Sequence, residues 1–252
     1  MIVRHSSLIS RLGRLVKVKR FGTPQSSYVF SQSSLTSIIE KLKTTNEDRI
    51  EIYTNPGFEE IFKKYGYYQK ERYYTVIIDL TKTEEELWKN LDKKRRNGIR
   101  YATKNKVIVN VSKEGEYLEF YKILYETYKR NKWLGFPDLT SLQGENKILM
   151  LAKYGDKIIA GSLVRFEGEG ATYSMNGSLP EFLRFKPNEL LLWEIVKLCK
   201  ERGFKELNLS GSTRFKREFG GKLTPIDCWV KDKRIWIRWK EKARSDWMFD
   251  FS

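Results

Sequence analysis

A basic run, KKRRNGIRYATKN, occupies residues 93–105 and contains six Lys or Arg side chains, no acidic residue and one glycine near its middle. Guanidinium groups bind phosphate through two parallel hydrogen bonds, and ammonium groups add positive charge. We therefore predict that four cations of this run bind a phosphate-bearing substrate: Arg95, Arg96, Arg100 and Lys104. The alternative is that each is a solvated side chain on the surface of a helix.

Histidine and cysteine are scarce, which excludes several kinds of catalytic site. The chain contains one histidine, His5, and two cysteines, Cys199 and Cys228. They are too few for a Cys/His zinc site, and a Ser-His-Asp or Cys-His site would need His5. We expect Cys199 to be a small core residue, and we expect neither a metal nor a bound cofactor. The chemistry must come from Lys, Arg, Tyr, Ser, carboxylates and backbone amides.

The overall charge favours a polyanionic partner. The 252 residues carry a net charge of +16, with an isoelectric point near 9.6. Nucleic acid, an anionic membrane surface or a phosphate-bearing small molecule would each be attracted. No apolar run in the sequence is long enough to span a bilayer. We expect a cytoplasmic protein, with peripheral contact to the membrane as an option.

The first 39 residues contain Lys and Arg but no acidic side chain. Leu8, Leu12 and Leu15 recur at helical spacing, which would suit an amphipathic helix on anionic lipid. The Arg/Ser-rich composition is also typical of a transit peptide. We favour a third interpretation, a first strand or a loose basic arm, because VKVKRF (16–21) alternates in polarity.

One long helix is predicted over residues 81–106. Thr83 is a plausible N-cap, and Glu86 three residues later completes a capping box. Gly98 lies inside this helix at a cost of about 1 kcal/mol relative to alanine. We therefore expect Gly98 to mark the close approach of another backbone or of a ligand.

The order of predicted elements is that of an α/β protein. Strands are expected at 49–54, 72–80, 107–111, three times within 149–179, and at 205–211, 224–232 and 234–239, with further helices at 35–47, 56–66, 116–131 and 187–203.

This order resembles the GNAT acyltransferase fold, a mixed sheet flanked by helices in which the ligand lies between two splayed strands. Tyr173, Asn176 and Ser178 fall on the strand before the central helix, and Asn188 falls at the start of that helix. We predict that these four residues bind substrate. GNAT enzymes that use acyl-CoA carry a glycine-rich loop here, whereas this chain has RFKPNELLLWE (184–194) without glycine. Backbone amides alone could not cradle a pyrophosphate in this stretch, although Arg184 and Lys186 could hold phosphate by charge.

Three runs in order resemble the FemABX family of aminoacyl-tRNA-dependent peptidoglycan bridge transferases. They are EEELWKNLDKKRRNGIRYATKNKVIV (84–109), PNELLLWEIVKLCKERGFKELNLSG (187–211) and FKREFGGKLTP (215–225). The resemblance implies two tandem GNAT-like subdomains and transfer of an amino acid from aminoacyl-tRNA to an amine on a peptidoglycan precursor. It therefore implies tRNA as a partner and a phosphate-bearing or lipid-linked acceptor.

The resemblance also implies a catalytic role for Lys216, which matches the family's Phe-Lys motif. Its cation would lie beside developing negative charge or a substrate phosphate; the alternative is a surface lysine in a basic loop. Phe215 is assigned to substrate binding, with packing as its alternative. Asn208 stands where the family commonly has an acid. Three carboxylates remain as equal candidates for the base: Glu194, Asp227 and Asp79.

The chain before residue 81 is too short for a complete first subdomain. We therefore predict a reduced N-terminal βα subdomain over 1–80, a GNAT-like transferase domain over 81–235 and a tail over 236–252. A CoA-dependent N-acyltransferase and a non-catalytic RNA- or membrane-binding relative remain as alternative functions.

Overall fold

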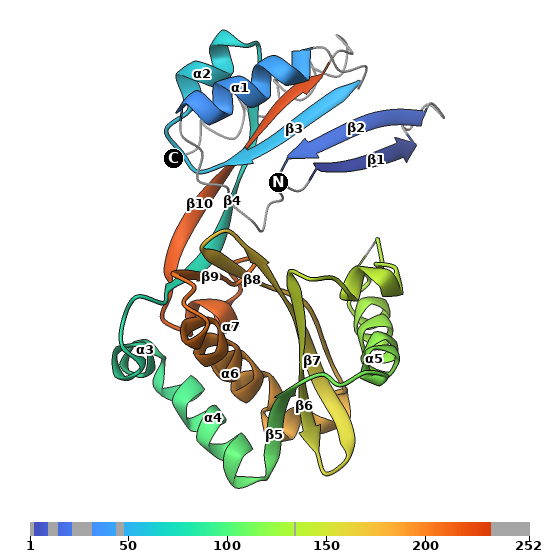
Figure 1. The fold of residues 1–252 in the computed structure, drawn as a ribbon, viewed down its shortest axis with the longest axis vertical. Helices are drawn as coiled ribbons and strands as arrows, with labels where there is room; N and C mark the ends of the chain where they lie inside the picture. The colour runs from blue at the N-terminus through green and yellow to red at the C-terminus, as the bar shows by residue number, and fades with distance from the viewer. Residues whose placement is uncertain (1–2, 10–14, 22–31, 44–47, 134, 233–252) are drawn as a thin grey trace, which may run out of the picture. The chain divides into compact units, whose positions relative to one another are not determined.

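The computed structural model describes residues 3–9, 15–21, 32–43, 48–133 and 135–232 (Figure 1). The strands are β1 Val3–Ile9, β2 Leu15–Phe21, β3 Arg49–Thr54, β4 Tyr68–Asp79, β5 Val107–Val111, β6 Lys147–Tyr154, β7 Lys157–Glu167, β8 Gly170–Ser178, β9 Glu206–Asn208 and β10 Lys222–Asp232. The helices are α1 Gln32–Lys43, α2 Glu59–Lys64, α3 Glu84–Asn90, α4 Lys93–Lys104, α5 Glu116–Arg130, α6 Pro187–Glu201 and α7 Arg214–Arg217, with 3₁₀ turns η1 Leu139–Leu142 and η2 Pro180–Phe185.

The chain divides into two compact units, residues 1–75 with 223–252 and residues 76–222. This division differs from the predicted one, because residues 223–232 join the first unit rather than the transferase domain. The predicted strand at 234–239 and the predicted tail at 236–252 lie outside the described residues.

The second unit is a mixed sheet with helices on both faces. Its strand order is β4-β9-β8-β7-β6-β5, in which β8 and β9 are parallel and the other neighbours are antiparallel. Successive side chains of a strand point to opposite faces. Accordingly Leu149 and Leu151 pack in the cluster with α5, whereas Met150 and Ala152 pack in the cluster with α4 and α6. The GNAT-like α/β fold, a mixed sheet flanked by helices, is therefore confirmed.

A gap opens between β8 and β9 where a GNAT ligand is expected. The two strands pair only from Gly170 and Glu206 to Thr172 and Asn208. Beyond this point β8 continues to Ser178 while the chain after β9 follows β4 instead, with Leu209 N–H donating to the Val76 carbonyl. The second half of β8 thus has one side open to a ligand.

The predicted helix over 81–106 is two helices, α3 and α4. The capping box at the start of α3 is present, since Thr83 Oγ1 accepts from the Glu86 N–H and the Glu86 carboxylate accepts from the Thr83 N–H. The chain then turns extended at Leu91, and the Asp92 carboxylate accepts the Lys94 N–H at 2.7 Å as the N-cap of α4. Asp92 was the overlooked sequence signal, because Asp is among the best N-cap residues.

The first unit contains strands in the order β1-β2-β3-β10-β4 and the helices α1 and α2. The alternative of an amphipathic helix, which was not the favoured one, does not hold at Leu8 and Leu15, because they lie in β1 and β2; Leu12 lies outside the described residues. The strand predicted for VKVKRF is confirmed. The core of this unit includes Phe62 of α2 stacked on Trp229 of β10, with ring centroids 4.7 Å apart.

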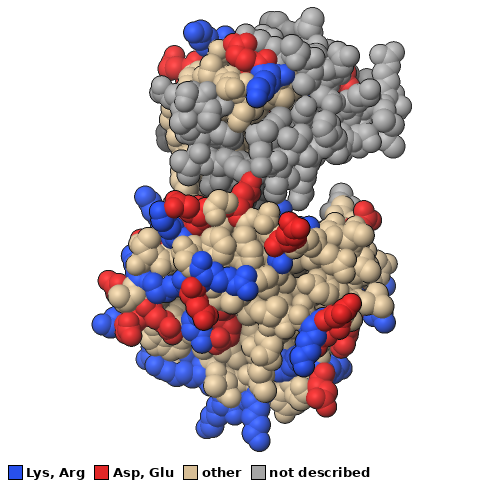
Figure 2. Space-filling view, in the orientation of Figure 1, with Lys and Arg blue, Asp and Glu red and all other residues tan. Residues whose placement is uncertain are grey.

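Charges of both signs are interspersed on the face of the molecule drawn in Figure 2, within the described residues. The net positive charge of the chain therefore does not identify one binding site on this face.

Candidate active site

A cavity of about 230 Å³ lies at the open part of β8, in the second unit. It gathers residues that are far apart in the sequence, from β8, α6 and α7. Six predicted site residues line it together: Tyr173, Asn176, Ser178, Asn188, Phe215 and Lys216. The sequence did not indicate the opposite wall, which comes from α5 and the following loop and contains Thr127, Arg130, Asn131 and Trp133.

Lys216 projects into this pocket as a partly desolvated cation. Its Nζ donates a hydrogen bond to the Ser210 carbonyl at 2.7 Å and lies 5.9 Å from the centre of the Tyr173 ring. Within the described part of the chain, no carboxylate forms an ion pair with Lys216. Burial lowers the pKa of Lys216 to about 8. A backbone carbonyl takes one of three ammonium N–H donors, so donors remain for a substrate oxygen.

A β-bulge turns Asn176 toward the pocket. Between the pairs Gly161–Gly177 and Leu163–Ser174, β8 has one residue more than β7, and Met175 adopts a left-handed φ of 49°. Such bulges re-aim side chains beside functional sites. The Oδ1 of Asn176 is buried and has no hydrogen-bond partner among the described residues. An N–H group of a bound substrate would satisfy this acceptor.

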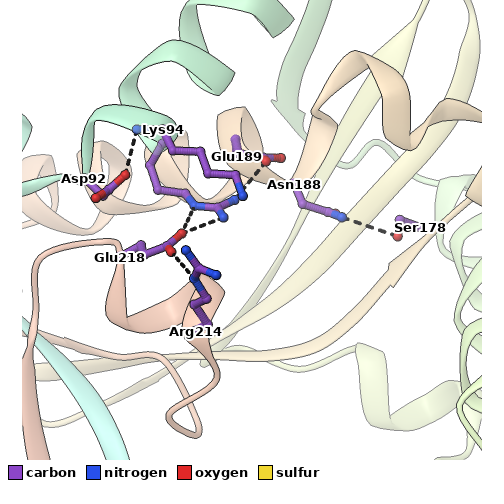
Figure 3. A network of polar contacts seen from close by, with 8 residues as sticks. Asp92, Lys94, Ser178, Asn188, Glu189, Arg214 and Glu218 are labelled. Carbon is purple, nitrogen blue, oxygen red and sulfur yellow. Dashed lines mark hydrogen bonds and ion pairs between the residues drawn. The ribbon is translucent and has the colours of Figure 1, made fainter.

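Hydrogen bonds fix the end of β8 against its neighbours. Asn188 Nδ2 at the start of α6 donates to Ser178 Oγ at 3.4 Å (Figure 3). The Ser178 N–H donates to Thr127 Oγ1 at 3.2 Å, and Arg130 donates to the Ser178 carbonyl at 3.3 Å. Burial raises the pKa of Tyr173, so its hydroxyl stays protonated at neutral pH. Several polar groups of the pocket are therefore held in place by hydrogen bonds.

The prediction that Arg95 contacts a substrate phosphate needs correction, because protein carboxylates already bind its guanidinium. Arg95 is only 7% exposed, and it forms ion pairs with Glu189 of α6 at 2.9 Å and with Glu218, directly after α7, at 2.6 Å. Its guanidinium carbon also lies 4.7 Å from the centre of the Phe215 ring. Hydrogen bonds from Arg214 and Arg95 lower the pKa of Glu218. Arg95 thus joins α4, α6 and α7 and supports the residue next to Lys216.

The other cations of the basic run have separate positions. Arg96 donates to the carbonyls of Lys89 and Leu91, so its role is to cap the C-terminus of α3. Arg100 and Lys104 line a different cavity of about 530 Å³ beside Trp88 and Trp193, and their phosphate contact stays a prediction. The predicted four-residue phosphate site is therefore not a single site.

Gly98 lies against a side chain, rather than against the backbone or ligand that was predicted. A Cβ at this position would lie 3.0 Å from Cγ of Glu189, so the glycine allows α4 and the start of α6 to pack tightly. Trp193 and Cys199 are buried in the same core, as expected for Cys199.

None of the three candidate bases lines the Lys216 pocket. Glu194 is paired with Lys197 at 2.8 Å, and Asp79 accepts hydrogen bonds from Thr81. Asp227 belongs to the first unit, where Arg72 and Gln69 bind its carboxylate. Asn208 is buried, and its Oδ1 accepts the Ser210 N–H at 2.8 Å, so it shapes the loop to which Lys216 is bonded.

Comparisons with known proteins agree with this geometry. The acetyltransferase (GNAT) domain family matches residues 89–217, and the FemAB family matches residues 23–134. The first match includes Arg95, the open part of β8, α6 and Lys216. The chain belongs to the acetyltransferase (GNAT) domain family. The predicted resemblance to FemABX proteins is confirmed, and the chain is an acyltransferase.

Solved structures show the same fold at low sequence identity. A structure of FemX has 15% identity and a TM-score of 0.65, and covers 90% of this chain and 87% of its own. The C-terminal domain of a putative lysylphosphatidylglycerol synthetase from Agrobacterium fabrum has 12% identity and a TM-score of 0.63. The match covers 90% of this chain and 84% of that domain's chain. L-PGS from Bacillus licheniformis has 13% identity and a TM-score of 0.60, and the match covers 96% of this chain and 88% of the L-PGS chain. A search of curated protein sequences found no match.

In the residues that the structure describes, no group of three or more His, Cys, Asp or Glu side chains could hold a metal ion. None of the described helices is long and apolar enough to cross a bilayer.

The lowered pKa of Lys216 predicts a pH-dependent stability. Between pH 8 and 10.5 the unfolded chain keeps the lysine proton while the native protein has lost it, so wild-type stability rises with pH. Relative to Lys216→Gln, the free energy of unfolding should rise by about 2 kcal/mol from pH 7.5 to 9.5. Urea unfolding of both proteins at several pH values measures this difference. A constant difference across that range would show that Lys216 is not desolvated.

Proposed function

We propose that the protein transfers an aminoacyl group from aminoacyl-tRNA to a primary amine, such as that of a peptidoglycan-precursor peptide. The observation that carries this proposal is the desolvated Lys216 cation in a pocket without a lining carboxylate. The FemAB match and the similarity to FemX support an aminoacyl donor. Such a donor implies a cytoplasmic reaction, and a lipid-linked acceptor would bring the protein to the membrane surface.

The reaction needs a neutral amine and a stabilised oxyanion. The amine nitrogen attacks the ester carbonyl carbon, and the carbonyl oxygen becomes negatively charged. The Lys216 ammonium then stabilises this oxygen. The C–N bond forms, the ester C–O bond breaks, and the proton lost by the amine ends on the ribose oxygen of the RNA. A positive charge nearby also lowers the pKa of the incoming amine, which favours its neutral, attacking form.

Proton transfer falls to water or to the substrate in this proposal. The side chains that line the pocket include no carboxylate and no histidine. A substrate hydroxyl or a bound water can accept the amine proton and pass it to the leaving oxygen. No side chain of the pocket is therefore assigned as general base.

A direct test offers two donors in parallel. Purified protein receives labelled aminoacyl-tRNA or labelled acetyl-CoA together with cell-envelope amine acceptors, and mass spectrometry follows the product. We expect transfer from RNA that fails in Lys216→Ala and persists in Lys205→Ala, a matched exposed lysine paired with Glu169. Transfer from acetyl-CoA alone would favour the second candidate, a CoA-dependent N-acyltransferase, which the GNAT family match keeps open. RNA or membrane binding without transfer from either donor would indicate a non-catalytic relative.

Asn176 provides a separate prediction. Replacing Asn176 with leucine removes a buried acceptor that has no partner among the described residues, so the free energy of unfolding should rise by about 1 kcal/mol or more. Transfer activity should fall at least 10-fold if substrate binds this acceptor. Asn105→Leu is the control, because Asn105 donates to the Tyr101 carbonyl at an exposed helix end and should gain no stability. Loss of stability in Asn176→Leu would contradict the assignment.

A further inference from the structure

A second, larger cavity of about 730 Å³ lies beside α4 in the second unit. The walls come from α4 between Lys93 and Tyr101, from the end of η2 with the residue that follows it, and from the first turn of α6. Its lining residues are Asp92, Lys93, Lys94, Asn97, Gly98, Tyr101, Arg184, Lys186 and Glu189, and we call this cavity the α4–α6 cleft.

The α4–α6 cleft carries uncompensated positive charge. Its four cations are Lys93, Lys94, Arg184 and Lys186. Of its two carboxylates, Glu189 is paired with Arg95, and Asp92 accepts a backbone N–H as a helix cap. Among the described residues no carboxylate forms an ion pair with any of the four cations. A concave surface lined by one sign of charge concentrates the electrostatic potential and attracts anions.

The cleft adjoins the Lys216 pocket through the start of α6. Asn188 lines the pocket, whereas its neighbours in sequence Lys186 and Glu189 line the cleft. Figure 3 shows Asn188 directed toward Ser178, whereas Glu189 forms its ion pair with Arg95 of α4. An α-helix rises 1.5 Å per residue, so the two sites lie within about one helical turn of each other. The first turn of α6 thus borders both sites, which brings them within reach of one elongated ligand.

We propose that the α4–α6 cleft binds the phosphodiester backbone next to the 3′-terminal nucleoside of the RNA donor, whose ester occupies the Lys216 pocket. This inference rests on the proposed function. The arrangement of cations favours a chain of phosphodiesters over a single pyrophosphate. Pro187 has no N–H, and Lys186 before it is left-handed with a φ of 58°, so the start of α6 lacks the amide cradle that a pyrophosphate uses. Separate ammonium and guanidinium groups suit separate phosphates instead.

A membrane surface is the less favoured partner of this cleft. The four cations are exposed, but they lie around a concave cleft, whereas a bilayer presents its anionic headgroups on a flat surface. RNA can place single phosphates inside such a cavity, and each lysine or arginine contact releases counterions.

The test measures binding of deacylated tRNA, which carries no aminoacyl ester. Fluorescence anisotropy gives its dissociation constant at several salt concentrations for the wild type and for the variant Lys93→Gln/Lys94→Gln/Arg184→Gln/Lys186→Gln. The control is Lys113→Gln/Lys122→Gln/Arg202→Gln/Lys205→Gln, which also removes three exposed lysines and one exposed arginine but none that lines the cleft or was predicted to bind phosphate. Circular dichroism checks that each variant is folded.

We expect the cleft variant to bind RNA roughly 100-fold more weakly near 0.1 M salt, with a log–log salt dependence shallower by about 3. The control should change that slope by less than about 1. Equal slopes for the two variants would overturn the proposal. The proposal would also be overturned if the cleft variant bound RNA as the wild type does but no longer bound CoA or phosphatidylglycerol vesicles. Because deacylated tRNA cannot donate an aminoacyl group, binding that depends on the cleft can be observed even if the protein transfers no aminoacyl group. The test of this inference is therefore separate from the test of the proposed function.

Discussion

Replacing Lys216 with alanine is expected to lower kcat/KM for aminoacyl transfer by roughly 100- to 1,000-fold, the usual effect of removing one oxyanion-stabilising donor. The pocket offers no second lysine, since Lys216 is its one lysine among the lining residues and Arg130 is bonded to the Ser178 carbonyl. The dissociation constant for deacylated tRNA should stay the same, because Lys216 does not line the α4–α6 cleft. Single-turnover rates with labelled aminoacyl-tRNA, measured beside Lys205→Ala, provide the comparison.

The pH dependence separates a charge effect from a structural one. If the reaction needs the Lys216 cation, wild-type activity should fall as the pH rises through about 8, where that cation loses its proton. Lys216→Arg stays charged above this pH, so any activity it retains should not show that fall. Activity in Lys216→Ala near the wild-type level would remove Lys216 from the mechanism.

The sequence predicted the fold because each element carried a local signal. Alternating strands, the Thr83 capping box and the apolar helix from Pro187 are readable from short-range patterns, and all three are present. The break between α3 and α4 was missed because the surrounding residues favour a helix throughout. Only the short side chain of Asp92, which caps α4, distinguishes two helices from one.

The candidate site was predicted in part, for a related reason. Residues on β8 and beside Lys216 could be assigned from the order of strands and from the family motif. The α5 wall could not, because Thr127 and Trp133 reach the pocket only through tertiary packing. Arg95 could not be separated from its basic neighbours either. Its two carboxylate partners are 94 and 123 residues away, and charge patterns in sequence do not show such contacts.

Arg95→Met is expected to destabilise the protein by about 3 kcal/mol, because it leaves two partly buried carboxylates without their shared cation. Transfer activity should fall as well, since Phe215 loses the guanidinium beside its ring and Lys216 is the next residue. Urea unfolding and single-turnover rates measure the two effects. Arg202→Met is the control, because Arg202 is exposed, its guanidinium lies over the Phe166 ring, and it lines neither the Lys216 pocket nor the α4–α6 cleft.

A triple variant identifies the cause of that loss. In Arg95→Met/Glu189→Gln/Glu218→Gln the unpaired charges are gone, so much of the lost stability should return. Activity should stay low, because neutral side chains no longer hold α4 against α7 and the position of Lys216 is not restored. The midpoint of its pH profile should also move upward as the ammonium becomes more hydrated. Recovery of both stability and activity would mean that Arg95 serves the fold and has no part in positioning Lys216.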